Sequence, residues 1–349
     1  MLLQSIISNP DTPQSYVYAE TAFHHEGSLA YLEELIDAAA RSGSNGIKFQ
    51  LLLDPNSVYS EKLPHIDRIR SWCFGPEQWL GLINMARDLG LDVIAMPIDM
   101  ESVAFALEHQ SLLAATEIHS ICFNEYPMLE ALHRQESPVL LNIGGRTVDE
   151  IETTLGELSG IGAALVYGLQ NFPTDPYGIH LARIAEYKRH FSRIMGYADH
   201  TTADKPELGT LLSCHAYVMG CRIFERHITT QRGTQRIDHE AAVLPTDIRA
   251  MIEELDRTAR ILGDGSIHEL TDRDTTYRRR QKQIVFARDM STGEQIGSTG
   301  EQIGSADLTF MVTPDVGDFD QISYPSLIGK HIAREVARYA PVLAGDVES

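Results

Sequence analysis

Eight short apolar runs typical of β-strands alternate with helical patterns from the start of the chain to about residue 263. Eight alternations over ~250 residues match the size and rhythm of a (β/α)8 barrel, so we expect that fold. A doubly wound open sheet is the second choice, but no Gly-x-Gly-x-x-Gly motif follows the first predicted strand. The predicted strands are Tyr16–Thr21, Gly46–Leu52, Asp92–Ile98, Glu117–Cys122, Pro138–Ile143, Ala164–Leu169, Ile194–Tyr197 and Tyr217–Phe224.

The predicted helices between these runs carry start and stop signals. Their apolar residues recur at three- and four-residue spacing, which is typical of a helix with one buried face. Small polar residues and proline favour helix starts, and glycine favours the position just after a helix. The expected boundary residues are Ser28, Gly75-Pro76 and Thr147 at helix starts, and Gly263 after a long helix from about Pro245 to Leu262.

The composition of the chain changes after the last predicted barrel helix. We expect a barrel domain over residues 1–265, a polar linker over 266–282 and a small β-rich domain over 283–349. In the last domain, the seven residues of Thr292–Ser298 (TGEQIGS) are repeated unchanged as Thr299–Ser305. A copy this short cannot form a repeat fold, so we interpret it as an insertion in a surface loop.

The charge balance limits the classes of partner. The net charge is −20, which disfavours nucleic acid and anionic membranes and means that an anionic substrate must be attracted by local positive charge. No run approaches the roughly 20 apolar residues that cross a bilayer, and the amino terminus lacks a basic region typical of a signal peptide. The four cysteines have no metal or redox spacing. We therefore expect a cytoplasmic protein with reduced thiols.

Two histidines follow the seventh and eighth predicted strands: His200 in Gly196–Thr201 and His227 in Glu225–Thr229. In a barrel, chemistry is located at the carboxyl ends of the strands. Two imidazoles there could bind a divalent metal and leave positions open for substrate. The alternative is that each is a hydrogen-bonded residue at a strand end. Other polar residues at these ends are Glu20, Lys48, Gln50, Asp99, Ser120, Asn142, Gln170, Asn171, Asp199 and Glu225.

Lys48 is the most unusual of these residues, because it interrupts a strand that should be buried. An interior ammonium usually needs an anionic partner.

Several segments, taken in order, resemble the N-acetylneuraminate (sialic acid) synthase family, and the resemblance covers nearly the whole chain. These segments are Tyr18–Glu20, His24–Ser28, Ile47–Gln50, Met96–Asp99, Gly196–Thr201, Glu225–Thr229 and Asp238–His239, and in the tail Ala287–Met290 and Ile328–Lys330, which are similar to the family's antifreeze-like (SAF) domain. Members join phosphoenolpyruvate to an open-chain N-acetylhexosamine. The resemblance therefore implies a metal-assisted transferase that forms a carbon–carbon bond, releases phosphate and makes nonulosonic acids.

The resemblance also implies roles for individual residues. His200 and His227 match the metal ligands, with Mn²⁺ the expected ion and Mg²⁺ or Co²⁺ as alternatives, and Lys48 matches a contact to phosphoenolpyruvate. Glu20, Gln50 and Asp238 match positions that hold the hexosamine. The expected catalytic residues are Glu20, Lys48, His200 and His227. The expected substrate-binding residues are Gln50, Ser120, Gln170, Phe172 and Asp238. The family further implies a homodimer in which each carboxyl-terminal domain lies over the partner's barrel.

The chain departs from the family at the donor side of the site. Glu117 stands where members carry a lysine that binds phosphoenolpyruvate; the other departures are Cys122 for an acidic residue, Met96 and Ala198 for hydroxyl residues, and Gln170 and Phe172 for asparagine and tyrosine. A glutamate in place of a lysine changes the local charge by two units. Either residues 114–126 align differently, or Arg146 or Lys205 replaces the lysine, or the donor is not phosphoenolpyruvate. The two functional hypotheses are a synthase with a divergent donor site and a non-catalytic, metal-binding paralogue.

Overall fold

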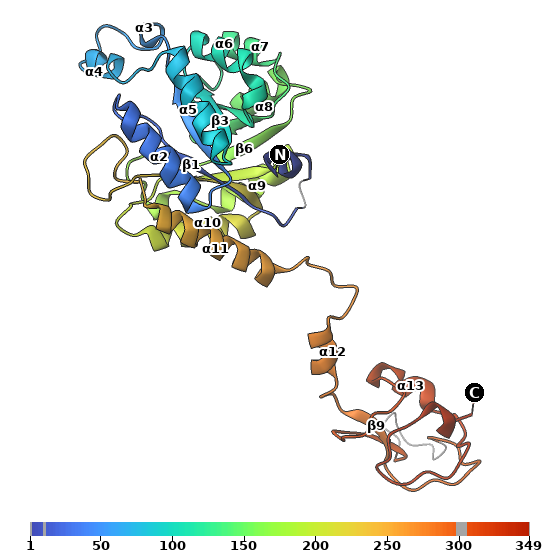
Figure 1. Ribbon diagram of the computed structural model, residues 1–349. Coiled ribbons are helices and arrows are strands. Elements are labelled where there is room, and N and C mark those ends of the chain that lie inside the picture. Colours follow the sequence, from blue (N-terminus) through green and yellow to red (C-terminus); the bar gives the residue numbers. More distant parts are fainter. Residues whose placement is uncertain (1, 10–11, 298–305, 349) are drawn as a thin grey trace. The chain divides into compact units, whose positions relative to one another are not determined.

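The computed structural model describes residues 2–9, 12–297 and 306–348. Eight strands form a closed barrel in which every strand pairs in parallel with the next, and β1 pairs with β8 (Figure 1). The predicted (β/α)8 fold is confirmed. The strands are β1 Tyr16–Glu20, β2 Gly46–Leu51, β3 Asp92–Pro97, β4 Ala115–Ile118, β5 Val139–Asn142, β6 Ala163–Tyr167, β7 Met195–Asp199 and β8 Cys221–His227.

Helices surround the barrel (Figure 1). They are α1 Leu2–Ser8, α2 Leu29–Ser42, α3 Pro55–Val58, α4 Ile66–Arg70, α5 Pro76–Asp88, α6 Met100–Glu108, α7 Tyr126–Leu132, α8 Val148–Glu157, α9 Ala182–Phe191, α10 Pro206–Val218 and α11 Pro245–Leu262, with short 3-10 turns at Gln110–Leu112, Ser120–Cys122 and Pro176–Gly178. The predicted caps are present, since Ser28 and Thr147 accept hydrogen bonds from the first turns of α2 and α8, and Gly263 follows α11 with a φ of 67°.

Two apolar cores hold the barrel together. Strand side chains alternate between the barrel interior and its outer surface. One buried cluster includes Tyr16 and Tyr18 of β1, Leu140 of β5 and Ile223 of β8. A larger cluster packs the outer faces of the strands against the surrounding helices. Apolar and aromatic side chains therefore fill the barrel interior away from the carboxyl ends of the strands. Those ends are left for polar groups.

The predicted fourth and eighth strands differ most from the observed ones. The fourth strand was expected at Glu117–Cys122, but it ends at Ile118, and Ser120–Cys122 form a 3-10 turn. The eighth strand was expected at Tyr217–Phe224, but Tyr217 and Val218 complete α10, and the strand runs from Cys221 to His227. In both places a short apolar run fits a strand as well as a turn or a helix end, so periodicity alone does not separate them.

The chain divides into two units, residues 1–264 and 265–349. In the second unit, β9 Gln283–Phe286 pairs antiparallel with β10 Leu308–Met311 over a small apolar core. The expected linker contains a helix, α12 Asp272–Arg278, and the unit also holds α13 Tyr324–Leu327 and 3-10 turns at Gln321–Ser323 and Ala344–Asp346. The second TGEQIGS copy, with Ser298, lies outside the described residues.

Across the described ranges, no helix has the length and apolar character needed to cross a membrane.

Candidate active site

Strand register gathers polar side chains at the carboxyl end of the barrel. In β1, Glu20 lies opposite Lys48 of β2 on one side and His227 of β8 on the other. Tyr18, two residues earlier on the same face, lies opposite Glu225. Because β1 is the strand that closes the barrel, residues from both ends of the barrel sequence meet here.

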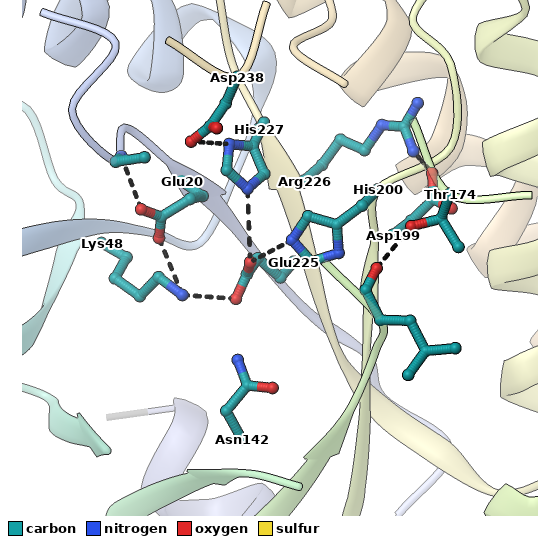
Figure 2. Close-up of polar contacts among 12 residues, drawn as sticks. Glu20, Lys48, Asn142, Thr174, Asp199, His200, Glu225, Arg226, His227 and Asp238 are labelled. Carbon is teal, nitrogen blue, oxygen red and sulfur yellow. Dashed lines mark hydrogen bonds and ion pairs between the residues drawn. The ribbon is translucent and has the colours of Figure 1, made fainter. Parts of the chain in front are cut away.

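Lys48 lies at the centre of three buried carboxylates. Its Nζ is 2.9 Å from Glu20 Oε2, 2.6 Å from Glu117 Oε1 and 2.6 Å from Glu225 Oε2, and the lysine side chain is 1% exposed (Figure 2 shows the contacts to Glu20 and Glu225). The Tyr18 hydroxyl lies 2.9 Å from Glu117 Oε2 and 2.8 Å from Glu225 Oε2, so it links two of the carboxylates. The interior ammonium expected to need an anionic partner has three.

The charges of this cluster do not cancel. One ammonium against three carboxylates leaves a net charge of −2 when all three carboxyls are ionised. Burial alone would lower the pKa of Lys48, but attraction to Glu117 and Glu225 outweighs burial and raises it, so the lysine stays protonated. Burial raises the pKa of Glu117. Burial acts on Glu225 in the same sense, but Lys48 and His200 overcome it and hold the pKa of Glu225 below its usual value.

His200, Glu225 and His227 form a group that could hold a metal ion, with one ligand atom from each lying within 4.8 Å of the others. Glu225 Oε1 is 3.8 Å from His200 Nε2 and 4.0 Å from His227 Nε2 (Figure 2). These three atoms are buried and none has a hydrogen-bond partner. Buried polar atoms normally have partners, so three that face one another fit a shared cation. Two imidazoles and one carboxylate are a suitable donor set for a divalent ion with open positions.

The protonation of the histidines is compatible with metal binding, which requires neutral imidazole. Burial lowers the pKa of His200 to about 4. Burial, together with repulsion from His200 and Lys48, holds the pKa of His227 well below its usual value. Both rings are therefore neutral at physiological pH.

Phe172 and Asp238 border the two histidines. The Phe172 ring packs edge-on against both imidazoles, with centroids 5.5 Å from that of His200 and 5.8 Å from that of His227. Asp238 Oδ2 is 3.9 Å from His227 Nδ1 (Figure 2). Burial raises the pKa of Asp238 to about 6, with a further contribution from Glu240. An apolar ring and a carboxyl group thus flank the histidine pair.

A third histidine, His119, also faces the cluster, and the sequence did not indicate it. Its pKa is lowered to about 4 by burial and then by Lys48, while Glu225 and a hydrogen bond with Gln170 act in the opposite direction. Gln170 is thereby placed beside the site. His119 lies in the loop after β4, and the incorrect boundary of that strand had placed it inside the strand.

Glu225 is a second residue whose role was missed, although its position was recognised. The Glu-x-His spacing in β8 directs Glu225 and His227 to the same face of the strand, because strand side chains repeat every two residues. This spacing was the available signal.

The other predicted residues are less directly placed. Gln50 is buried two residues beyond Lys48 on the same face of β2. Ser120 opens the 3-10 turn after β4 and is half-buried. Asp199 belongs to a different network, since it forms a buried ion pair with Arg226 and accepts a hydrogen bond from Thr201.

Neither cation considered as a replacement for the family's lysine pairs with the cluster. Arg146 Nη1 is 3.4 Å from Glu150, and its guanidinium lies over the Phe123 ring. Lys205 is exposed at the start of α10. In the part of the chain that the structure describes, Lys48 is the only lysine or arginine that forms an ion pair with the three carboxylates.

Comparisons with known proteins agree with this fold. The NeuB family model matches residues 35–267. An uncharacterised protein of Methanocaldococcus jannaschii is 26% identical over 286 residues, which cover 81% of this chain and 82% of the relative. The N-acetylneuraminate-9-phosphate synthase of Drosophila melanogaster is 26% identical and covers 72% of this chain and 70% of its own. A crystal structure of a Chromobacterium violaceum protein, named for spore coat polysaccharide biosynthesis, superposes with a TM-score of 0.82 at 22% identity over 96% of this chain and 100% of that one.

Proposed function

Because the chain belongs to the NeuB family and is an enzyme of the nonulosonate synthase type, we propose that it joins a three-carbon enolic donor to the aldehyde of an open-chain N-acetylhexosamine, assisted by a divalent metal. The observation that carries this proposal is the triad of buried, unpartnered ligand atoms on His200, Glu225 and His227.

The triad supplies the residues that would hold the ion, with Mn²⁺ the expected metal and Mg²⁺ or Co²⁺ as alternatives. A divalent ion bound there would polarise a carbonyl oxygen and make its carbon a better electrophile. Glu225 links the triad to Lys48, so the ligand group and the ammonium occupy fixed positions relative to each other. Such preorganisation is what electrostatic catalysis requires.

The remaining residues have positioning roles in this proposal. Glu20 is fixed by the Ala22 backbone N–H, which donates to its Oε1 at 2.6 Å, so that its Oε2 faces Lys48. Asp238 can accept a sugar hydroxyl beside His227. Phe172 shields the imidazoles from water. Gln50, Ser120 and Gln170 are the further residues that we assign to substrate contact.

Phosphoenolpyruvate is the donor that the family resemblance implies, and its use would release phosphate. The alternatives are a different donor and a metal-binding, non-catalytic role for the barrel. A pure scaffold has no physical need for Lys48 among three carboxylates beside a ligand triad, and this favours an enzyme.

We propose further that the second unit is an antifreeze-like domain and that the protein is a cytoplasmic homodimer in which this domain lies over the partner's barrel. Size-exclusion chromatography with light scattering measures the oligomeric state. A monomer would exclude the shared arrangement.

The reaction is tested by offering Mn²⁺-loaded protein a panel of N-acetylhexosamines together with phosphoenolpyruvate and pyruvate. A nine-carbon 2-oxo acid is expected by mass spectrometry, and its formation should require both sugar and metal. His227→Ala is the blank. Equal product from the wild type and His227→Ala would remove the metal role, and no product from any combination would contradict the function.

A further inference from the structure

Asp199 and Arg226 form a buried ion pair directly behind the ligand triad. They are partners in the pairing of β7 with β8, and their side chains are 0% and 3% exposed (Figure 2). Side chains alternate between the two faces of a strand, so Arg226 lies on the opposite face of β8 from Glu225 and His227. The pair therefore lies on the outer side of the barrel wall, where α10 packs, while the ligands face the interior.

The pairing of β8 with β7 is irregular, and the ion pair forms only because of this irregularity. The register shifts by one residue just after Met195. In an unshifted register Asp199 would lie beside Glu225 instead of Arg226, and two neighbouring carboxylates repel each other. A shift by one residue also exchanges the two faces of a strand. In the unshifted register, Glu225 and His227 would therefore share the outer face with Asp199.

Asp199 also holds the backbone on both sides of His200. Its Oδ2 accepts a hydrogen bond from Thr201 Oγ1 at 2.9 Å, and its Oδ1 accepts one from the Tyr197 hydroxyl at 3.1 Å. Among the described residues, no side chain forms a hydrogen bond with the ring of His200. A metal-binding histidine is usually oriented by such a bond on its second nitrogen. The direction of this ring therefore depends on the backbone that Asp199 holds.

The neighbouring helix leaves room for the pair. Gly209 of α10 lies against it, and a Cβ at this position would overlap with both Asp199 Oδ2 and Arg226 Nη1. The ion pair, the two strands and α10 thus fit together at one point. That point is one residue along the chain from each of the three ligands.

We propose, resting on the metal-assisted function above, that Asp199 and Arg226 are positioning residues. Their pair selects the register in which Glu225 and His227 face the interior, and Asp199 holds the backbone that directs His200. Both residues act through the ligands and not on the substrate. Without the pair, the three ligand atoms converge less closely, and the site binds its ion weakly although the barrel still folds.

A double variant separates positioning from stability. Asp199→Asn combined with Arg226→Met removes both charges, and replacing a buried ion pair with neutral groups often leaves stability unchanged. Calorimetric titration of metal-free protein measures the Mn²⁺ affinity, and electron paramagnetic resonance of the bound ion reports the symmetry of its ligands. The affinity should fall at least about tenfold and the spectrum should change, while the midpoint of urea unfolding stays close to that of the wild type.

Leu3→Ala is the control for stability. Leu3 is fully buried in α1 and belongs to the same apolar cluster as Tyr16, the first residue of β1, away from the carboxyl ends of the strands. This variant should lower the unfolding midpoint and leave the Mn²⁺ affinity and spectrum unchanged. An equal loss of affinity in Leu3→Ala would assign the effect to general stability and overturn the positioning role.

Two outcomes distinguish this proposal from the function on which it rests. Wild-type affinity and spectrum in the double variant would overturn the positioning role and leave the proposed function standing. A wild-type protein that does not bind Mn²⁺ would contradict the proposed function, and the positioning role with it.

Gly209→Ala decides the matter if the double variant does not fold. The new Cβ displaces the ion pair without changing a charge or a ligand, so Mn²⁺ binding should be weaker than in the wild type. Unchanged binding in Gly209→Ala would overturn the positioning role.

Discussion

Replacing Lys48 with methionine removes the ammonium that three buried carboxylates share. Methionine has a similar length and fills much of the same volume, so the change tests charge more than packing. Glu20, Glu117 and Glu225 then lie in the barrel interior without their cation. The Tyr18 hydroxyl still contacts two of them, but one hydroxyl proton cannot replace an ammonium.

Removing one partner of a buried ion pair costs about 3–5 kcal/mol, because the other charge is left uncompensated. Here three carboxylates lose a partner, so we expect Lys48→Met to reduce the free energy of unfolding by at least about 3 kcal/mol. The loss is limited because a carboxyl can take up a proton instead. Burial already raises the pKa of Glu117, so that group is the first expected to do so.

Tryptophan fluorescence during urea unfolding measures this loss in the barrel alone. The chain has two tryptophans, and both Trp72 and Trp79 are buried in the barrel unit. Arg189→Met is the matched control, because the Arg189–Glu186 pair is exposed and should contribute less than about 1 kcal/mol. Adding Glu117→Gln to Lys48→Met should recover at least about 1 kcal/mol, since one carboxylate fewer is stranded.

If Lys48→Met were as stable as Arg189→Met, the cluster would not be a charge-compensated unit.

Three further changes probe the strand ends and the site walls. Gly144→Ala should destabilise the barrel by about 3 kcal/mol or more, because the new Cβ would lie 1.8 Å from the Gly168 carbonyl oxygen. Gly81 lies in the exposed middle of α5 with open space around it, so Gly81→Ala should instead stabilise the barrel by about 1 kcal/mol. The same fluorescence assay compares the two glycine variants. Phe172→Ala should lower kcat about tenfold by admitting water, while Mn²⁺ affinity is retained. Phe172→Tyr should keep most of the activity. Equal kcat in the wild type and both variants would exclude the shielding role. Asp238→Asn should raise the KM of the sugar about tenfold with a smaller change in kcat, and a change confined to kcat would argue against sugar binding.

The barrel was predictable because the alternation of strand and helix patterns recurs eight times up to about residue 263. Eight alternations tolerate an error of a few residues in any one strand, as the fourth and eighth strands illustrate. The strand ends are less predictable. Whether Tyr217 ends a helix or begins a strand depends on what it packs against, and periodicity in a short apolar run does not contain that information.

The candidate site was predictable where residues belong to one strand or one motif. His200, His227 and Lys48 each follow from a local pattern that is unusual in a buried strand. The pairing of Lys48 with Glu117 does not, because it joins residues 69 positions apart and depends on the barrel's register and side-chain directions. His119 could not be assigned to the site from the sequence either, because the predicted fourth strand ran past it. The observed strand ends at Ile118 and is followed by a turn.

Titration of Mn²⁺ into metal-free protein tests the central claim most directly, because every role assigned to this site depends on the triad. The geometry predicts one ion per barrel, with binding lost in His200→Ala and weakened at least about tenfold in Glu225→Gln. Undiminished Mn²⁺ binding in both variants would contradict the assignment of His200, Glu225 and His227 as the metal site.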